Sequence, residues 1–217
     1  MTDEPKLAAL AVRSIACQLR GSDELLYAPV GFACARIASN GSVETREWWF
    51  MPGRLPDRAT ILWHWLRHPL FFGRTKEDML KSRLTLNSAF FEVLRYAAGA
   101  PLVVRREKLL RSMLEQGLDA NYLPALNSLK FLSLIDVTES LERRINTEGW
   151  RFSQSGDELY KLCRLLKMTD SAKMPKNRDS LASEAHLMLE LGRRIVASRD
   201  YTGELRPPRP RRPPRGQ

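Results

Sequence analysis

The sequence predicts a mixed α/β domain. Two apolar runs rich in β-branched and aromatic residues, 30–38 and 42–51, flank an Asn-Gly pair, which indicates an antiparallel hairpin. Helix-period patterns then alternate with short apolar runs along the rest of the chain. A hairpin followed by alternating helices and strands is typical of a mixed sheet with helices packed on it.

The first hairpin strand carries several small residues among its apolar side chains. Gly31, Ala33 and Ala35 would let helices approach closely, so we expect an interior strand that is covered on both faces. The turn at Asn40-Gly41 is predicted to be a two-residue type I′ turn, which needs φ > 0 at both positions.

The other expected elements follow from apolar periodicity and from helix-terminating residues. Thr75 begins a capping-box pattern and predicts the start of a long helix that runs to Ala98. Gly117 is expected in the C′ position of a helix over residues 107–116. Further strands are expected at 10–16 and 102–104, a strand or buried loop at 130–137, and helices at 61–66, 157–168 and 179–198.

Length and composition indicate a single domain inside the cell. A chain of 217 residues suits one domain of ordinary size, and no run reaches the roughly 18 apolar residues that span a bilayer. Acidic residues precede the first apolar run, unlike in a secretory signal. The scattered cysteines Cys17, Cys34 and Cys163 lack metal-ligand spacing and are interpreted as buried apolar side chains in a reducing compartment. We therefore expect a cytoplasmic protein with no membrane partner.

The formal net charge of +10 is concentrated at one end of the chain. Residues 206–217 hold five arginines, five prolines and no acidic residue. Because these prolines forbid a helix or a central strand, we expect residues 201–217 to form a disordered, polyproline-II-like basic tail after a single domain over residues 1–200. Such a tail attracts nucleic acid or an acidic partner, and the alternative is a tail that only improves solubility.

Few short motifs point to chemistry. The sequence has no phosphate-binding glycine loop, Cys-x-x-Cys pair or nucleophile elbow. His64 and His68 have the i, i+4 spacing of metal ligands, but no third ligand lies nearby and tryptophans are interleaved, which favours packing. His186 lies in the middle of the last expected helix and is interpreted as an ordinary part of it.

Several longer segments carry a family resemblance through their order. They are residues 29–33 with the hairpin turn, 60–65, 103–117, 135–141 and 178–183. This succession resembles the DEDD-type 3′–5′ exonucleases, in particular an RNase H-like branch common in phages and mobile elements. The resemblance spans residues 7–198 and implies an RNase H-like mixed sheet flanked by helices.

The same resemblance implies a site and shows where this chain departs from it. Members of the family bind two divalent metals through four carboxylates. By this alignment the first two carboxylate positions fall on Ala11 and Arg13, the third near Arg106, the last on Ser183, and the general-base histidine on Arg178. Mg²⁺ needs anionic or carbonyl oxygens, which guanidinium groups cannot supply. We therefore expect no metal cofactor and no catalysis by the family mechanism.

The substituted arginines suggest phosphate binding instead. Guanidinium groups make planar, bidentate contacts with phosphate. The hypothesis is a catalytically inactive exonuclease-like protein that binds DNA or RNA as an accessory subunit of a larger nucleic-acid-processing complex, with a protein or ribonucleoprotein partner and self-association left open. The predicted nucleic-acid-binding residues are Arg13, Arg106, Arg178, Arg206, Arg209, Arg211, Arg212 and Arg215.

Three alternatives stay open. The arginines could form internal ion pairs with Glu107, Asp179 or Glu184 instead of binding phosphate. The fold could serve only as a protein-docking module, which an exposed tryptophan at position 48 or 49 would favour. An active nuclease with a rearranged site would need Glu107, Asp136, Asp179 and Glu184 to converge.

Overall fold

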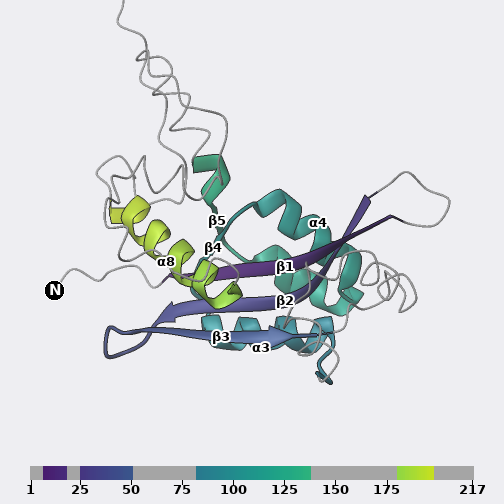
Figure 1. Cartoon of the computed structure of the whole chain (residues 1–217), viewed down its shortest axis with the longest axis horizontal. Helices are drawn as coiled ribbons and strands as arrows, with labels where there is room; N and C mark the ends of the chain where they lie inside the picture. Colours follow the sequence, from purple (N-terminus) through teal and green to yellow (C-terminus); the bar gives the residue numbers. More distant parts are fainter. Residues whose placement is uncertain (1–6, 19–24, 51–81, 138–179, 198–217) are drawn as a thin grey trace, which may run out of the picture.

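The described part of the chain forms a five-stranded sheet with helices on both faces (Figure 1). A computed structural model describes residues 7–18, 25–50, 82–137 and 180–197. The strand order is β3-β2-β1-β4-β5; β2 is antiparallel to β1 and β3, and β4 is parallel to β1 and β5. The strands are β1 (Ala8–Gln18), β2 (Leu25–Ile37), β3 (Val43–Trp49), β4 (Leu102–Val104) and β5 (Phe131–Ser133). The mixed α/β class expected from the sequence is confirmed.

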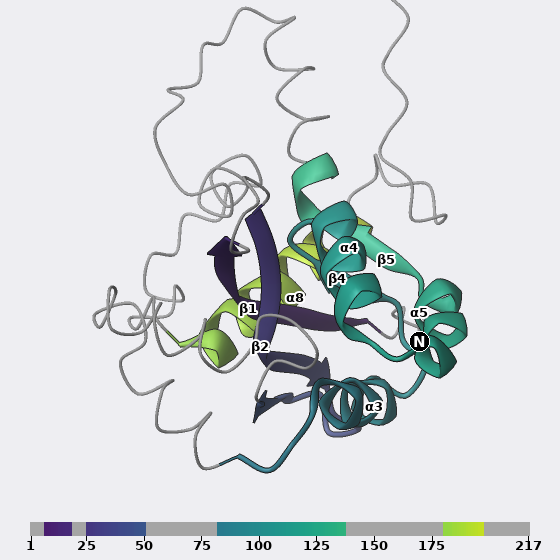
Figure 2. The ribbon, with the colours of Figure 1, turned by 90° about the vertical axis from the view of Figure 1, so that its right-hand side faces the viewer.

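Helices cover the two faces of the sheet unequally. The long helix α8 (Leu181–Ala197) packs on one face, against β1, β2 and β3. Helices α3 (Leu86–Ala97) and α4 (Glu107–Gly117) cover the other face, as the side view in Figure 2 shows. Beside α4 lie the 3₁₀ turn η1 (Ala120–Tyr122) and the short helix α5 (Leu123–Ser128). Within the described residues, no helix combines the length and the apolarity that a membrane crossing requires.

Alternating side chains of the interior strands belong to two apolar cores, one on each face of the sheet. On β1, Ala9 and Ala11 belong to the core beneath α8, whereas Ala8 and Leu10 belong to the core beneath α3 and α4. The neighbouring strand β2 alternates in the same way. Because side chains alternate between the faces of a strand, both strands are apolar at successive positions. The expected interior strand, covered on both faces, is confirmed.

Two glycines allow unusually close packing against the sheet. A Cβ on Gly192 of α8 would lie 2.5 Å from Cγ2 of Val103 on β4, so only glycine lets the helix sit this close to the strand. A Cβ on Gly31 would lie 2.5 Å from the ring of Trp49, its partner on β3. Gly31, which was predicted to let a helix approach, instead makes room for the Trp49 side chain of the neighbouring strand, and the close approach of a helix depends on Gly192, which was not predicted.

Cys34 lies in the core between β2 and α3. Its side chain is 0% exposed, and burial raises the pKa of the thiol to about 12 against a weaker opposing effect of Arg36. The thiol is therefore neutral and inert at physiological pH, which confirms the expectation for this cysteine. Cys163 lies outside the described residues.

The hairpin turn differs from its prediction. Asn40 does not have positive φ; only Gly41 does, at 82°. Gly41 N–H donates to Ala38 O at 2.9 Å, and Ala38 N–H donates to Ser42 O at 2.8 Å. These bonds define a three-residue loop with a glycine bulge, not a two-residue type I′ turn. Asn40 Oδ1 additionally accepts from Ser42 N–H at 3.0 Å, which favours the wider loop.

The predicted start of the helix that ends near Ala98 was wrong. Residues 82–84 are not helical, and α3 begins after Thr85, whose hydroxyl accepts from Ser88 N–H at 3.2 Å. Thr85 is the N-cap of α3 in the structure, whereas Thr75 lies outside the described residues. The predicted helices at 61–66 and 157–168 and the tail at 201–217 lie outside the described residues.

The ends of two other elements also needed correction. Gly117 is the last residue of α4, not a left-handed C′ residue, and a Cβ there would lie 2.6 Å from Leu86 Cδ2. Its role is therefore close packing against α3. The apolar run at 130–137 forms a strand only over Phe131–Ser133, and residues 134–137 turn into a helix. The expected last helix is confirmed as α8, with its predicted apolar face buried.

Candidate nucleic-acid-binding cleft

A cleft of about 340 Å³ lies beside the paired parallel strands β1 and β4, and residues of α4 and α8 also line it. Its floor is the middle of β1, and its walls are the end of β4, the first turns of α4 and the first turn of α8. The lining residues are Leu10, Ala11, Val12, Arg13, Ser14, Val104, Arg105, Arg106, Leu109, Leu110, Met113 and Glu184. Among these residues, the charged side chains are three arginines and one glutamate.

Arg13 is positioned by an irregularity in β1. It pairs with Gly31 of β2, and the register of the two strands shifts between Arg13 and Ser14. Such a bulge turns the strand and re-aims the side chains next to it. Arg13 thus reaches the cleft from a strand whose other residues are mostly apolar.

Arg105 and Arg106 occupy the turn between β4 and α4. The carbonyl oxygen of Arg105 accepts from Ile135 N–H at 3.1 Å, which holds this turn against the helix that follows β5. Arg106 is the N-cap of α4, and its carbonyl accepts from Leu110 N–H at 3.1 Å. The cap makes no side-chain hydrogen bond to α4. The positive end of the helix dipole therefore adds to the two guanidinium groups at this wall.

Glu184 reaches the cleft from α8 and partly offsets the arginines. Its Oε1 lies 3.7 Å from Nη1 of Arg105, and the two side chains are 24% and 40% exposed. At this distance and exposure the ion pair is weak.

The start of α8 is fixed by bonds outside the cleft. Ser183 N–H donates to Ser180 Oγ at 3.4 Å, and Ala182 N–H donates to Oε1 of Glu47 on β3 at 2.6 Å. The other oxygen of the Glu47 carboxylate accepts from the Trp49 indole at 3.3 Å. Together these bonds set the register of α8 and thereby the position of Glu184.

Comparison with solved structures identifies the fold. A 3′-exonuclease described in the 3′-end-specific recognition of a histone mRNA stem-loop matches with a TM-score of 0.54 and 11% identity, over 90% of this chain and 83% of that chain. The nuclease domain of 3′hExo, a DEDDh family member bound to rAMP, matches with a TM-score of 0.50 and 12% identity, over 90% and 93%. This chain has the RNase H-like fold of the DEDDh 3′-exonucleases. The fold implied by the sequence resemblance is thereby confirmed.

A third solved structure, of a full-length 3′-exonuclease, also shares the fold, with a TM-score of 0.52 and 13% identity over 89% of this chain and 82% of that chain. No protein-family model and no curated protein sequence matches the chain. At this identity the likeness to the exonucleases is one of fold.

The cleft residues do not fit the two metals of the exonuclease mechanism. Ala11 and Arg13 hold two of the positions where the resemblance places carboxylates, and both line the cleft. Among the described residues of the lining, Glu184 is the only carboxylate, and it faces Arg105. A methyl group and guanidinium groups cannot coordinate a hard divalent cation. Over the described ranges, no three His, Cys, Asp or Glu side chains lie close enough to hold a metal ion.

The structure brings together two of the predicted binding residues and adds a third. Arg13 and Arg106 line one cleft, as expected, while Arg178 and the tail arginines lie outside the described residues. The prediction missed Arg105. The signal was present, because ligands of open α/β sheets bind where parallel strands end and Arg105 directly follows β4.

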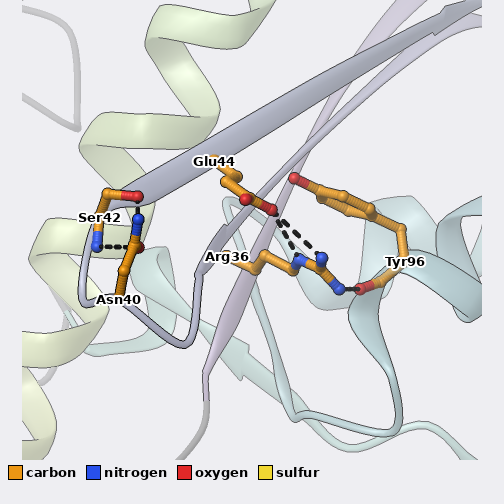
Figure 3. A network of polar contacts seen from close by, with 5 residues as sticks. All are labelled: Arg36, Asn40, Ser42, Glu44 and Tyr96. Atoms are coloured by element: carbon orange, nitrogen blue, oxygen red, sulfur yellow. Dashed lines mark hydrogen bonds and ion pairs between the residues drawn. The ribbon is translucent and has the colours of Figure 1, made fainter.

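A second hollow, of about 690 Å³, lies at the opposite end of the sheet between the β2–β3 hairpin and the end of α3. Arg36 projects there and is fully engaged (Figure 3): its Nε and Nη2 donate to Glu44 Oε2 at 3.4 and 3.2 Å, and Nη1 donates to Tyr96 O at 3.0 Å. The guanidinium also lies 4.3 Å from the centre of the Tyr96 ring. These contacts tie the hairpin to α3, so we assign Arg36 a structural role.

Proposed function

We propose that this protein binds a nucleic-acid strand in the cleft without cutting it. The observation that carries the proposal is the meeting of Arg13, Arg105 and Arg106 in one cleft of an exonuclease-like fold. Arginine is well suited to phosphate, because its planar donors form bidentate, charge-assisted hydrogen bonds. The positive end of α4 supports the same role, since helix N-termini attract anions.

The donor set of the cleft supports the proposal that the bound strand is not cut. Metal-assisted phosphodiester hydrolysis needs ions that activate a water and neutralise charge on the reacting phosphate. By the resemblance, Ala11, Arg13, Arg106 and Ser183 stand at or near the positions of those ligands, and none of them supplies a carboxylate, so the proposed strand is bound but not hydrolysed by that mechanism. Because a protein that only holds a strand needs another component to act on it, the proposal includes an accessory role in a larger nucleic-acid-processing complex, with the basic tail adding affinity.

The two other functions considered from the sequence receive less support. Trp48 and Trp49 are both partly buried; Trp48 contacts the Tyr96 ring edge-on, and Trp49 packs over Gly31. An exposed aromatic docking patch is therefore not present at these two positions. A rearranged acidic site that includes Glu107 also receives less support, because Glu107 Oε1 pairs with Arg111 Nε on the same helix at 2.8 Å.

Binding and cleavage can be tested together on the full chain. Labelled single- and double-stranded DNA and RNA are titrated across a salt series, with Mg²⁺ or Mn²⁺ present, and product length is followed by gel electrophoresis. The expected result is binding that weakens steeply with salt while the strands stay intact. Shortened product that disappears when Arg13 and Arg106 are replaced by glutamine would overturn the proposal, and so would a lack of binding at low salt.

A further inference from the structure

We propose that two copies of this chain associate through their β3 strands, which pair antiparallel and join the two sheets into one. β3 is the outermost strand of the sheet, and no strand of the described ranges pairs with its outer edge (Figure 1). An edge strand presents a row of backbone N–H and C=O groups that another strand can bind. β3 contributes no residue to the lining of the cleft, so each copy keeps its own cleft accessible.

The backbone groups that face away from β2 belong to alternate residues of β3. In the β2–β3 ladder, Phe50 N–H donates to Val30 O at 3.0 Å, and Ala38 N–H donates to Ser42 O at 2.8 Å. The register is unbroken between these two bonds, so the even-numbered residues of β3 direct their backbone groups at β2. The odd-numbered residues, with Thr45 among them, therefore direct their N–H and C=O groups at the outer edge.

Contacts on both faces hold β3 in its extended conformation. On the face of α8, Oε1 of Glu47 accepts from Ala182 N–H at 2.6 Å. On the opposite face, the guanidinium of Arg46 lies 5.0 Å from the centre of the Tyr96 ring. The edge is thus ordered before a partner binds, which lowers the entropic cost of association.

The charges along β3 select one register for the pairing of two copies. A two-fold axis at Thr45 pairs residues 43–47 and places Glu44 of each copy opposite Arg46 of the other. Axes at Glu44, Arg46 or Glu47 would instead place like charges directly opposite each other, which destabilises a strand pair. An axis at Trp48 would pair only residues 47–49 of the strand.

Glu44 and Arg46 are both able to take a partner across the axis. Nε and Nη2 of Arg36 donate to the same oxygen of Glu44, Oε2, at 3.4 and 3.2 Å, so Oε1 can accept from the other copy (Figure 3). Arg46 is exposed and forms no ion pair with another residue of the described ranges. A second copy supplies the carboxylate that this guanidinium lacks.

Sedimentation velocity of the full chain over a concentration series tests the association, after nuclease treatment has removed bound nucleic acid. The expected result is a concentration-dependent species of twice the 24.9 kDa mass of the chain. Thr45→Pro removes the outward N–H at the axis but keeps every hydrogen bond to β2, because proline is tolerated on an edge strand. We expect this variant to be a folded monomer, with its fold checked by circular dichroism.

Charge variants test the register. Arg46→Glu places two carboxylates opposite each other on both sides of the axis, so association should weaken roughly tenfold or more. The double variant Glu44→Arg, Arg46→Glu puts opposite charges back across the axis and should regain that loss. Arg95→Glu is the control: it makes the same charge reversal at an exposed position of α3 and should leave association unchanged.

The contrary outcomes are distinct. A monomer at every concentration overturns the proposal and leaves the edge to an extended segment of a different protein. A dimer that persists in folded Thr45→Pro shows that the copies meet elsewhere and also overturns it. If the folded double variant does not regain the association that Arg46→Glu loses, the register about Thr45 is wrong.

Discussion

Arg111 shows how a single side chain can connect three segments. Its Nε pairs with Glu107 Oε1 at 2.8 Å, and its two terminal nitrogens donate to the carbonyls of Leu126 and Leu129 at 3.2 Å each. The guanidinium also lies 4.6 Å from the centre of the Phe131 ring. Arg111 therefore fastens α4 to the end of α5 and the start of β5, which bounds the sheet next to the cleft.

We predict that Arg111→Met destabilises the protein by about 2 to 3 kcal/mol, because two partly buried carbonyls lose a charged donor while the apolar stem is kept. Urea unfolding followed by circular dichroism measures the change. Arg95→Met is the matched control: its arginine is 66% exposed and pairs only along its own helix, so we expect a change within about 0.5 kcal/mol. Equal stability of the two variants would contradict the role assigned to Arg111.

Glu184 is predicted to weaken anion binding in the native cleft. Removing its charge with Glu184→Gln should tighten nucleic-acid binding roughly fivefold, equivalent to about 1 kcal/mol at a partly exposed site. Fluorescence anisotropy with a labelled single strand measures this. The control is Glu190→Gln, which removes the same charge from α8 but pairs with Arg194 outside the cleft lining. If the two variants bind alike, Glu184 does not act on the ligand.

Single residues of the site were only partly predictable from sequence. Arg13 and Arg106 could be placed because the order of motifs aligned them with known carboxylate positions. Arg105 was missed although it directly follows the predicted strand β4, and the turn that holds it is fixed by Ile135 N–H from a distant segment. The pairing of Glu184 with Arg105 depends likewise on how α8 is docked.

At the scale of elements, the position of α8 is set by the contact between Gly192 and Val103. A Cβ at position 192 would lie 2.5 Å from Cγ2 and 3.1 Å from Cγ1 of Val103, a stiff β-branched residue that cannot easily move aside. We predict that Gly192→Ala destabilises the protein by about 1 to 3 kcal/mol through overpacking. The additional change Val103→Ala should restore part of that loss in a double-mutant cycle of urea unfolding energies. Purely additive effects would show that the two residues do not contact each other.

The residue that caps the end of α3 has a strained backbone conformation, and a substitution can relieve that strain. Ala98 has φ 51° and ψ 41°, the left-handed conformation that favours glycine. We predict that Ala98→Gly stabilises the protein by about 0.5 to 1 kcal/mol, since relief of strain exceeds the entropy that glycine adds to the unfolded chain. Ala125→Gly, inside α5, should have the opposite sign and cost about 1 kcal/mol. Thermal unfolding of both variants measures these changes in stability. Destabilisation by Ala98→Gly would refute this interpretation.

Elements were predictable where local pattern and tertiary packing agree. The hairpin, the short strand β4 and the helices α4 and α8 follow directly from apolar periodicity. The start of α3 does not, because the capping-box pattern predicts a start at Thr75, whereas Thr85 is the N-cap of α3 in the structure. Gly117 was misassigned for a similar reason: its small size serves packing against Leu86, a contact between distant segments.

At the scale of the whole molecule, the two ends of the sheet differ in how their arginines are used. At the hairpin end, Arg36 is bound by Glu44 and by the carbonyl of Tyr96, and it holds the fold together. At the other end, Arg13, Arg105 and Arg106 share one cleft, in which Glu184 is the one carboxylate among the described lining residues. This asymmetry predicts that charge removal at the cleft affects binding, whereas charge removal elsewhere on the described surface has little effect.

The most direct test of strand binding in the cleft is the salt dependence of single-strand binding. Each lost phosphate contact lowers the slope of log K against log salt by about 0.7, so replacing Arg13, Arg105 and Arg106 by glutamine should lower its magnitude by roughly two. The matched variant replaces Arg95, Arg193 and Arg194, which removes the same charge outside the cleft lining. A reduced slope in the cleft variant alone is the predicted result. An unchanged slope in a folded cleft variant, or the same reduction in both variants, would contradict binding in the cleft.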